Sequence, residues 1–281
     1  MNLPAELIQN LVRAALAEDV GGGDVTTEFT VPADRRGTAH IIAKEPCVIA
    51  GLPLAKAVFN ELGARLTTLV LEGELTDTGQ RICEITGPTR AILTGERTAL
   101  NFLQRLSGVA TLTRQFVATI AGTKAEILDT RKTTPTLRVL EKYAVAIGGG
   151  TNHRLGLFDA VMIKDNHRAI LDARGSAALA EAVAAIRRQR PELPVIIEAD
   201  TLTDVERAVA AGANHILLDN MTLDELRDAV ELVAGRAKLE ASGGVRVATV
   251  RQIAETGVDY ISVGALTHSA RAVDLSLEVL P

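Results

Sequence analysis

The sequence predicts an α/β protein in which a layered α+β part is followed by repeated βα units. Between residues 37 and 93, short β-patterned runs surround one helical pattern, and from residue 125 onward short apolar runs alternate with helical patterns. Of the 281 residues, 47% are hydrophobic but only 2% are aromatic, so the core is expected to be aliphatic. This length suits one large domain or two.

The first part of the chain is framed by helical patterns. Apolar residues over 4–18 recur at helical spacing, with Asn2 as a possible cap, and the glycines of 21–24 end this pattern. Residues 95–122 predict one or two long helices, and a short helix is expected over 54–63. The β-patterned runs are 38–44, 47–51, 66–75 and 81–87. Strands with one intervening helix are typical of an α+β layer domain.

Six short apolar runs follow, separated mostly by helical patterns. The runs are 125–130, 159–165, 194–200, 214–220, 237–244 and 259–265, and the helical patterns include 177–189, 204–212 and 223–235. This alternation predicts a parallel sheet or barrel, although such a barrel usually has eight strands. A doubly wound sheet is the alternative, and in both arrangements ligands bind at the carboxyl ends of the strands.

Composition and charge exclude several classes of protein. A formal charge of −5 and the absence of Trp argue against a general nucleic-acid binder that stacks bases. Cys47 and Cys83 fit neither a disulfide framework nor a zinc site and are expected to be buried. No apolar run approaches 18 residues and the N-terminus lacks the organisation of a signal peptide, so a soluble cytoplasmic protein is expected.

Cations are concentrated in one stretch, residues 131–168. This stretch has a formal charge of +4, which leaves −9 for the rest of the chain. A solvated charged face is the ordinary explanation. Lys164, however, directly follows the apolar run Val-Met-Ile, where a buried lysine needs a partner or an anion. The stretch therefore favours an anionic substrate, because Arg and Lys are the side chains that bind carboxylate and phosphate.

Two further sets of residues follow strand patterns. Ser242, Gly243 and Gly244 precede a helical pattern and could bind phosphate through main-chain N–H groups, with Gly264 completing the site, although a tight turn explains the glycines equally well. Glu198 and Asp219 are carboxylates of the kind that bind Mg²⁺, or they balance the nearby cations. Among the histidines, His40, His215 and His268 are interpreted as structural and His167 is ambiguous.

Several segments together resemble quinolinate phosphoribosyltransferase, also called carboxylating nicotinate-nucleotide pyrophosphorylase. The resemblance spans nearly the whole chain and depends on residues 18–27, 95–111, 129–167, 218–221, 240–245 and 261–269. The block DTRKTTPTLRVLEKYAVAIGGGTNHRLGLFDAVMIKDNH at 129–167 is the most specific part. One departure is Thr136, where the family usually has glycine.

The resemblance implies an N-terminal α/β sandwich domain plus an incomplete parallel α/β barrel. The sandwich would span 1–108, with 268–281 returning to it, and the barrel would span 109–267. The family assembles as a homodimer in which Arg97 would reach the partner's site. Its reaction converts quinolinate and phosphoribosyl pyrophosphate into nicotinate mononucleotide, pyrophosphate and CO₂, with Mg²⁺ as cofactor.

The resemblance also assigns roles residue by residue. Arg131, Lys132, His153, Arg154 and Lys164 would hold the quinolinate carboxylates and the pyrophosphate. Glu198 and Asp219 would bind ribose hydroxyls or the metal, and Ser242, Gly243, Gly244 and Gly264 would bind the 5′-phosphate. Lys132, Lys164, Glu198 and Asp219 are expected to be catalytic.

Three other functions remain open. A paralogue from molybdenum-uptake loci has the same fold, without established quinolinate chemistry. A Schiff-base aldolase would use Lys164 as its nucleophile. The third alternative is a regulatory protein that binds a phosphorylated metabolite and does not convert it.

Overall fold

The computed structural model describes residues 3–280 and divides into two compact units. Unit 1 comprises the residues up to Arg114, Pro135–Gly149 and the residues from Ser269 onward, and unit 2 comprises Gln115–Thr134 and Gly150–His268. The predicted α/β class is confirmed, since a parallel six-stranded sheet accompanies a separate N-terminal part. The limits 1–108 and 109–267 stay a prediction.

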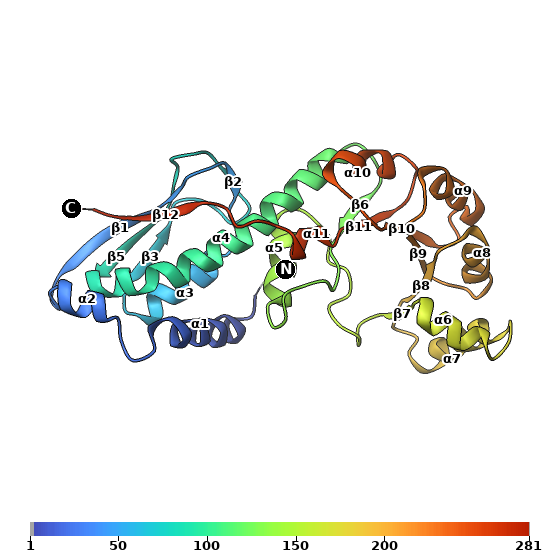
Figure 1. The fold of residues 1–281 in the computed structure, drawn as a ribbon, viewed down its shortest axis with the longest axis horizontal. Helices are drawn as coiled ribbons and strands as arrows, with labels where there is room; N and C mark the ends of the chain where they lie inside the picture. The colour runs from blue at the N-terminus through green and yellow to red at the C-terminus, as the bar shows by residue number, and fades with distance from the viewer. Residues whose placement is uncertain (1–2, 281) are drawn as a thin grey trace. The chain divides into compact units, whose positions relative to one another are not determined.

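Unit 1 is built on a four-stranded antiparallel sheet (Figure 1). Its order is β12 (Leu275–Val279), β1 (Arg36–Ala43), β5 (Arg81–Pro88) and β3 (Arg65–Thr68). A separate pair joins β2 (Cys47–Val48) to β4 (Leu75–Thr76). Cys47 and Cys83 are free and buried, as the sequence predicts.

Five helices begin in unit 1. They are α1 (Ala5–Val20), α2 (Val25–Thr30), α3 (Leu52–Glu61), α4 (Thr89–Thr119) and α5 (Arg138–Ile147). Pro4 stands at the N-cap of α1, and Asn2, the cap that the sequence suggests, lies outside the described residues. The long helical pattern proves to be the single helix α4. Asp24 caps α2 by accepting a hydrogen bond from the Thr27 main chain, which helps to lower the pKa of its carboxyl group.

Thr136, which precedes α5, has a φ of +69°. This left-handed conformation is unfavourable for a β-branched residue and costs about 1–3 kcal/mol. Replacing Thr136 by glycine should therefore raise the free energy of unfolding by about 1 kcal/mol, measured by denaturant titration. Thr136→Ala keeps the Cβ and should gain less, and a glycine variant no more stable than the parent would disprove the point.

Unit 2 contains six parallel strands in the order β6-β11-β10-β9-β8-β7 (Figure 1). They are β6 (Glu126–Leu128), β7 (Val161–Ile163), β8 (Val195–Ala199), β9 (His215–Asp219), β10 (Lys238–Ser242) and β11 (Tyr260–Ser262). From β7 to β11 each strand lies beside its predecessor, and β11 returns to β6. This circular order is that of a barrel rather than a doubly wound sheet. Because no pairing joins β6 to β7 within residues 3–280, the barrel is incomplete.

The helices of unit 2 follow its strands in sequence. They are α6 (Asp165–Asp172), α7 (Ala178–Gln189), α8 (Leu202–Ala210), α9 (Leu223–Val233), α10 (Val247–Ala254) and the short α11 (Ala265–His268). Thr201 caps α8 and Thr222 caps α9 through their hydroxyl groups, so strand and helix are joined by short, defined turns. Within residues 3–280, none of the helices combines the length and apolar character needed to cross a membrane.

Candidate active site

Polar residues at the carboxyl ends of the strands in unit 2 line one cavity of about 520 Å³. Its lining is formed by Thr130, Arg131, Lys132, His153, Arg154, Met162, Lys164, Asp165, Glu198, Leu217, Asp219, Glu240, Ser242 and Ser262. The structure therefore brings together the cations and carboxylates that the sequence singled out. This is the location expected for an active site in an α/β barrel.

Two guanidinium groups at this cavity lie close enough to repel each other. The pKa of Arg154 is lowered, first by burial and then by the charge of Arg131, and Asp159 opposes this shift. Arg154 donates a hydrogen bond to the carbonyl oxygen of Ala160 at 3.2 Å, and its other terminal nitrogen lies 3.4 Å from the sulfur of Met162. The Nε of Arg131 is buried without a hydrogen-bond partner among the described residues. Such a pair is suited to an anionic ligand that bonds to both groups.

The side chain of Lys164 is more exposed than the sequence predicts. It is 47% exposed rather than buried, because Lys164 follows the end of β7 and forms the N-cap of α6. Its ammonium group contacts Glu198 at 2.8 Å, and Glu198 also accepts a hydrogen bond from the Asp165 main chain at 3.3 Å. His167 accepts a hydrogen bond from the Lys164 main chain, which gives this ambiguous histidine a capping role. The partner of Lys164 is thus a buried carboxylate of the same site.

A second cavity of about 290 Å³ lies where the glycine residues follow β10 and β11, and it shares Thr130, Lys132, Ser242 and Ser262 with the first cavity. Gly243, Gly244, Gly264 and His268 also line it. Gly243 has a φ of +104°, and a Cβ there would lie 2.1 Å from Asn220 Oδ1. A side chain is excluded at that position, so the main chain itself forms the wall. Main-chain N–H groups at a helix start are suited to phosphate.

Glu198 and Asp219 are the two carboxylates that the sequence singles out as candidate metal ligands. They lie at the ends of the neighbouring strands β8 and β9 and line the same cavity. No group of three or more His, Cys, Asp or Glu side chains within residues 3–280 is arranged to hold a metal. The oxygen donors of Glu198 and Asp219 are of the type that Mg²⁺ takes from proteins, together with water and the oxygens of a phosphorylated substrate.

The sequence interpretation missed a buried ionic cluster at the wall of this cavity. Glu240 is 0% exposed, its Oε2 lies 3.2 Å from His153 Nε2 and 2.8 Å from His215 Nε2, and Ser262 donates a hydrogen bond to its other oxygen. Burial alone would raise the pKa of Glu240, but the contacts with His153 and His215 outweigh it and lower the pKa to about 2. His215 therefore does not stand apart from the site. The alternation along β10, which turns Glu240 to the same side as Ser242, is a signal that could have placed this carboxylate.

Arg97, the remaining predicted residue, belongs to α4 in unit 1. It lines a separate cavity of about 320 Å³ together with Asp19, Asp24 and Thr94. Asp24 accepts a hydrogen bond from the hydroxyl group of Thr94 at 3.0 Å. Arg97 is absent from the lining of both cavities in unit 2, and its expected action across a dimer stays a prediction.

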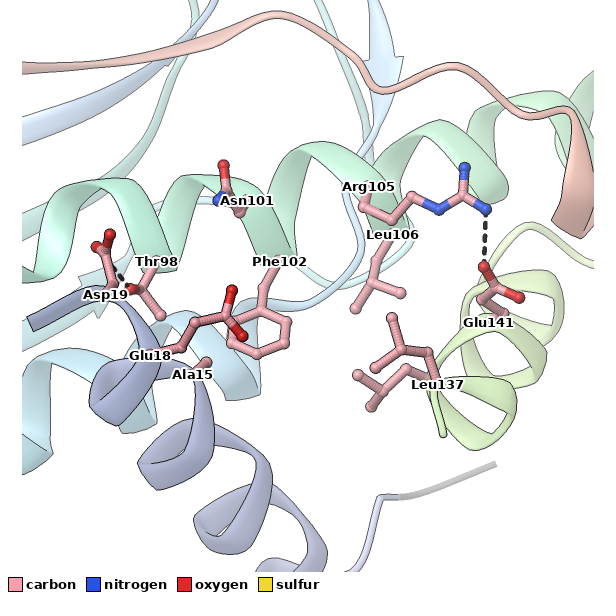
Figure 2. Close-up of a pocket in the computed structure, with 11 residues that line it drawn as sticks. Ala15, Glu18, Asp19, Thr98, Asn101, Phe102, Arg105, Leu106, Leu137 and Glu141 are labelled. Atoms are coloured by element: carbon pink, nitrogen blue, oxygen red, sulfur yellow. Dashed lines mark hydrogen bonds and ion pairs between the residues drawn. The ribbon is translucent and has the colours of Figure 1, made fainter. Parts of the chain in front are cut away.

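Unit 1 also contains a more apolar pocket, shown in Figure 2. Phe102 and Leu106 of α4 and Leu137 beside α5 contribute its apolar wall. The guanidinium group of Arg105, which also lines this pocket, forms an ion pair with Glu141 at 2.7 Å. In this pocket of about 240 Å³ the arginine thus already has a carboxylate partner, whereas the Nε of Arg131 in unit 2 has none among the described residues.

The barrel, the paired cations and the glycine-lined cavity together define an enzyme of phosphorylated, multiply anionic substrates. Two family models match the chain: the quinolinate phosphoribosyl transferase N-terminal domain over residues 24–107 and the C-terminal domain over 109–278. The chain belongs to the quinolinate phosphoribosyltransferase family.

Individual relatives agree with this assignment. The carboxylating nicotinate-nucleotide pyrophosphorylase of Mycobacterium leprae is 43% identical, over 96% of both chains. A mitochondrial decarboxylating quinolinate phosphoribosyltransferase of Nicotiana tabacum is 40% identical over 98% of this chain and 83% of its own. The solved nicotinate-nucleotide pyrophosphorylase of Francisella tularensis superposes with a TM-score of 0.92 at 40% identity, covering 99% of this chain and 98% of its own.

Proposed function

We propose that this chain transfers the phosphoribosyl group of phosphoribosyl pyrophosphate to quinolinate, with loss of CO₂, to give nicotinate mononucleotide and pyrophosphate for NAD synthesis. The observation that carries the proposal is the close pair Arg131 and Arg154, in which the buried Nε of Arg131 has no partner among the described residues. Quinolinate has two adjacent carboxylates, and each matches one guanidinium fork. Relatives that share about 40% of the sequence over most of the chain bear the name of this activity.

The remaining residues of the two cavities divide between the parts of the other substrate. Lys132 and Lys164 would bind the pyrophosphate together with the arginines, and His153 belongs to the same group of residues. The 5′-phosphate would lie in the cavity lined by Ser242, Gly243, Gly244 and Gly264, where main-chain N–H groups are available. Glu198 and Asp219 would bind ribose hydroxyls or the metal.

The proposed chemistry requires fixed charge more than proton transfer. When pyrophosphate leaves, the ribose acquires oxocarbenium character, which the carboxylates Glu198 and Asp219 stabilise. The pyridine nitrogen attacks the anomeric carbon and becomes cationic. The bond to the adjacent carboxylate then breaks, its electron pair stays on the ring carbon beside the positive nitrogen, CO₂ departs, and the carbon takes up one proton. Orientation and electrostatic stabilisation supply most of the rate.

Mg²⁺ is proposed as the cofactor, and when bound it would neutralise the charge of the departing pyrophosphate. Glu198 and Asp219 are the residues that would hold it. Glu198 would then be shared with the ammonium group of Lys164, its present partner at 2.8 Å. A homodimer is also proposed, with Arg97 completing the partner's site.

The decisive experiment incubates the purified chain with quinolinate, phosphoribosyl pyrophosphate and Mg²⁺ and follows CO₂ and nicotinate mononucleotide. We expect release of both only when all three are present, and we expect chelation of the metal by EDTA to stop the reaction. Nicotinate, which lacks the second carboxylate, should be a poor substitute for quinolinate. Absence of turnover under these conditions would refute the proposal and leave the molybdenum-locus paralogue or a binding protein.

The Schiff-base aldolase is disfavoured by the surroundings of Lys164. A nucleophilic lysine is activated by desolvation or by a second cation. Here the side chain is 47% exposed and paired with a carboxylate. Failure of borohydride to trap a carbonyl substrate on Lys164 would complete that exclusion.

A further inference from the structure

Glu240 is a fully buried carboxylate, and its role in the site has to be inferred from the residues that contact it. An isolated buried charge is strongly unfavourable, so it persists only with hydrogen-bonding partners. Among the described residues, His153 and Ser262 are hydrogen-bonded to Glu240, and Nε2 of His215 lies 2.8 Å from its Oε2. Together these contacts hold the carboxylate at the wall of the cavity that Arg131 and Arg154 also line.

The hydrogen bonds of His153 define its tautomer. The main-chain N–H of Arg154 donates to His153 Nδ1 at 2.7 Å, and since an N–H group can only donate, Nδ1 must be the unprotonated nitrogen. The ring hydrogen is then on Nε2, which donates to Glu240 at 3.2 Å. Both ring nitrogens are thus used within the protein. The ring is a rigid link between Glu240 and the main chain of Arg154.

His215 contacts both His153 and Glu240. Its ring is stacked on that of His153, with 6.2 Å between centroids, and packs at 5.3 Å on Tyr260. Its Nε2 contact with Glu240 is short but does not have the geometry of a regular hydrogen bond. The ring of His215 therefore packs on His153 and contacts Glu240 at the same time.

We propose that Glu240 and His215 are positioning residues for the capture of quinolinate: they fix the ring of His153, and through it the main chain that carries Arg154 into the cavity. The stretch that bears His153 and Arg154 is irregular, between Thr151 and the start of β7, so its geometry depends on such contacts. Asp129 supports the same stretch by accepting a hydrogen bond from the His153 main chain at 2.8 Å. This inference rests on the proposed function, because it takes quinolinate as the ligand of Arg154.

The kinetic test compares Glu240→Gln with the parent enzyme. We expect KM for quinolinate to rise about tenfold, the size expected when a hydrogen bond to a charged group is weakened, while KM for phosphoribosyl pyrophosphate changes less than about twofold. A merely structural role would lower the melting temperature and leave the quinolinate KM unchanged, and that result would overturn the proposal. Glu126→Gln is the matched control: it makes the same chemical change at an exposed carboxylate that binds Thr151 at 2.8 Å, and it should behave like the parent.

Two changes at His215 and one spectroscopic measurement keep the inference testable if Glu240→Gln does not fold. His215→Phe keeps the stacked ring and His215→Gln keeps a donor group; each should raise the quinolinate KM about threefold or more, and parental values in both would overturn the proposal. In the parent enzyme, imidazole ¹⁵N shifts should show His153 protonated at Nε2 and not at Nδ1. The opposite tautomer, or a doubly protonated ring, would refute the linkage. This measurement needs no turnover, so its failure is distinct from failure of the proposed function.

Discussion

Replacing Arg131 by alanine is expected to lower kcat/KM for quinolinate by roughly 30- to 3000-fold. Truncating one partner of a buried, hydrogen-bonded charge pair costs about 2–5 kcal/mol, and each 1.4 kcal/mol is about tenfold. The loss should fall on quinolinate, whose carboxylate would be left facing a single guanidinium group. Steady-state kinetics with each substrate varied in turn would measure it.

The same substitution should not destabilise the free enzyme. The buried Nε of Arg131 has no partner among the described residues. Burial, and next the like charge of Arg131, lower the pKa of Arg154, so the two guanidinium groups are expected to repel each other. Removing one of them relieves that repulsion, so we expect an equal or higher melting temperature together with the loss of activity. Arg188→Ala, at an exposed position on α7, is the control and should alter neither property. Near-parental activity of the Arg131 variant would contradict the assignment of the site.

Replacing Gly243 by alanine is the second change expected to have a large effect. The φ of +104° is strained for alanine, and the new Cβ would lie 2.1 Å from Asn220 Oδ1 and 3.0 Å from Asn220 Cα. Asn220 would have to move, and this movement would disturb the hydrogen bond of 2.8 Å that its side chain donates to Asp219. Because a misplacement of about 1 Å can cost about 100-fold in rate, we expect kcat/KM for phosphoribosyl pyrophosphate to fall by about that factor.

Gly235→Ala separates backbone strain from displacement of the site. Gly235 has a φ of +76°, but a Cβ there would meet nothing within 4 Å. This variant should lose some stability and keep its kinetic constants. If both glycine variants lost activity equally, the role of the wall at Gly243 would be disproved.

The fold could be predicted largely because its signals are local. Each of the six apolar runs after residue 125 contains a strand, since short apolar runs bounded by turns and helices have few other solutions. The number of helices in 95–122 could not be decided from periodicity, because Gly108 interrupts it. In the structure Gly108 lies within α4, and a Cβ there would be 1.9 Å from the carbonyl oxygen of Arg271, so the glycine permits close packing rather than ending the helix.

Site residues at the ends of strands could be predicted from the sequence. Contacts between residues that are far apart in the sequence could not. Lys164, Glu198 and Asp219 follow apolar runs, and they do line one cavity. The contacts of Glu240 join residues 87 positions apart in the sequence, and they arise from the register of the sheet and from the path of the stretch around His153. No local pattern carries that information. The exposure of Lys164 was mispredicted because this residue follows the last residue of β7 and forms the N-cap of α6, where its side chain is not enclosed by the sheet.

The pairing of β12 with β1 has a consequence for the order in which the chain folds. Lys44, which follows β1, and Glu278 of β12 form an ion pair although they are 234 positions apart in the sequence. During synthesis, β1 can therefore pair with β12 only after all the βα units of the barrel have left the ribosome. An unpaired strand edge invites association with other chains. In unit 2, β8 to β11 each pair with the strand before them in the sequence, so this part of the sheet can begin to form earlier. The free edge of β1 stays unprotected until β12 has been made.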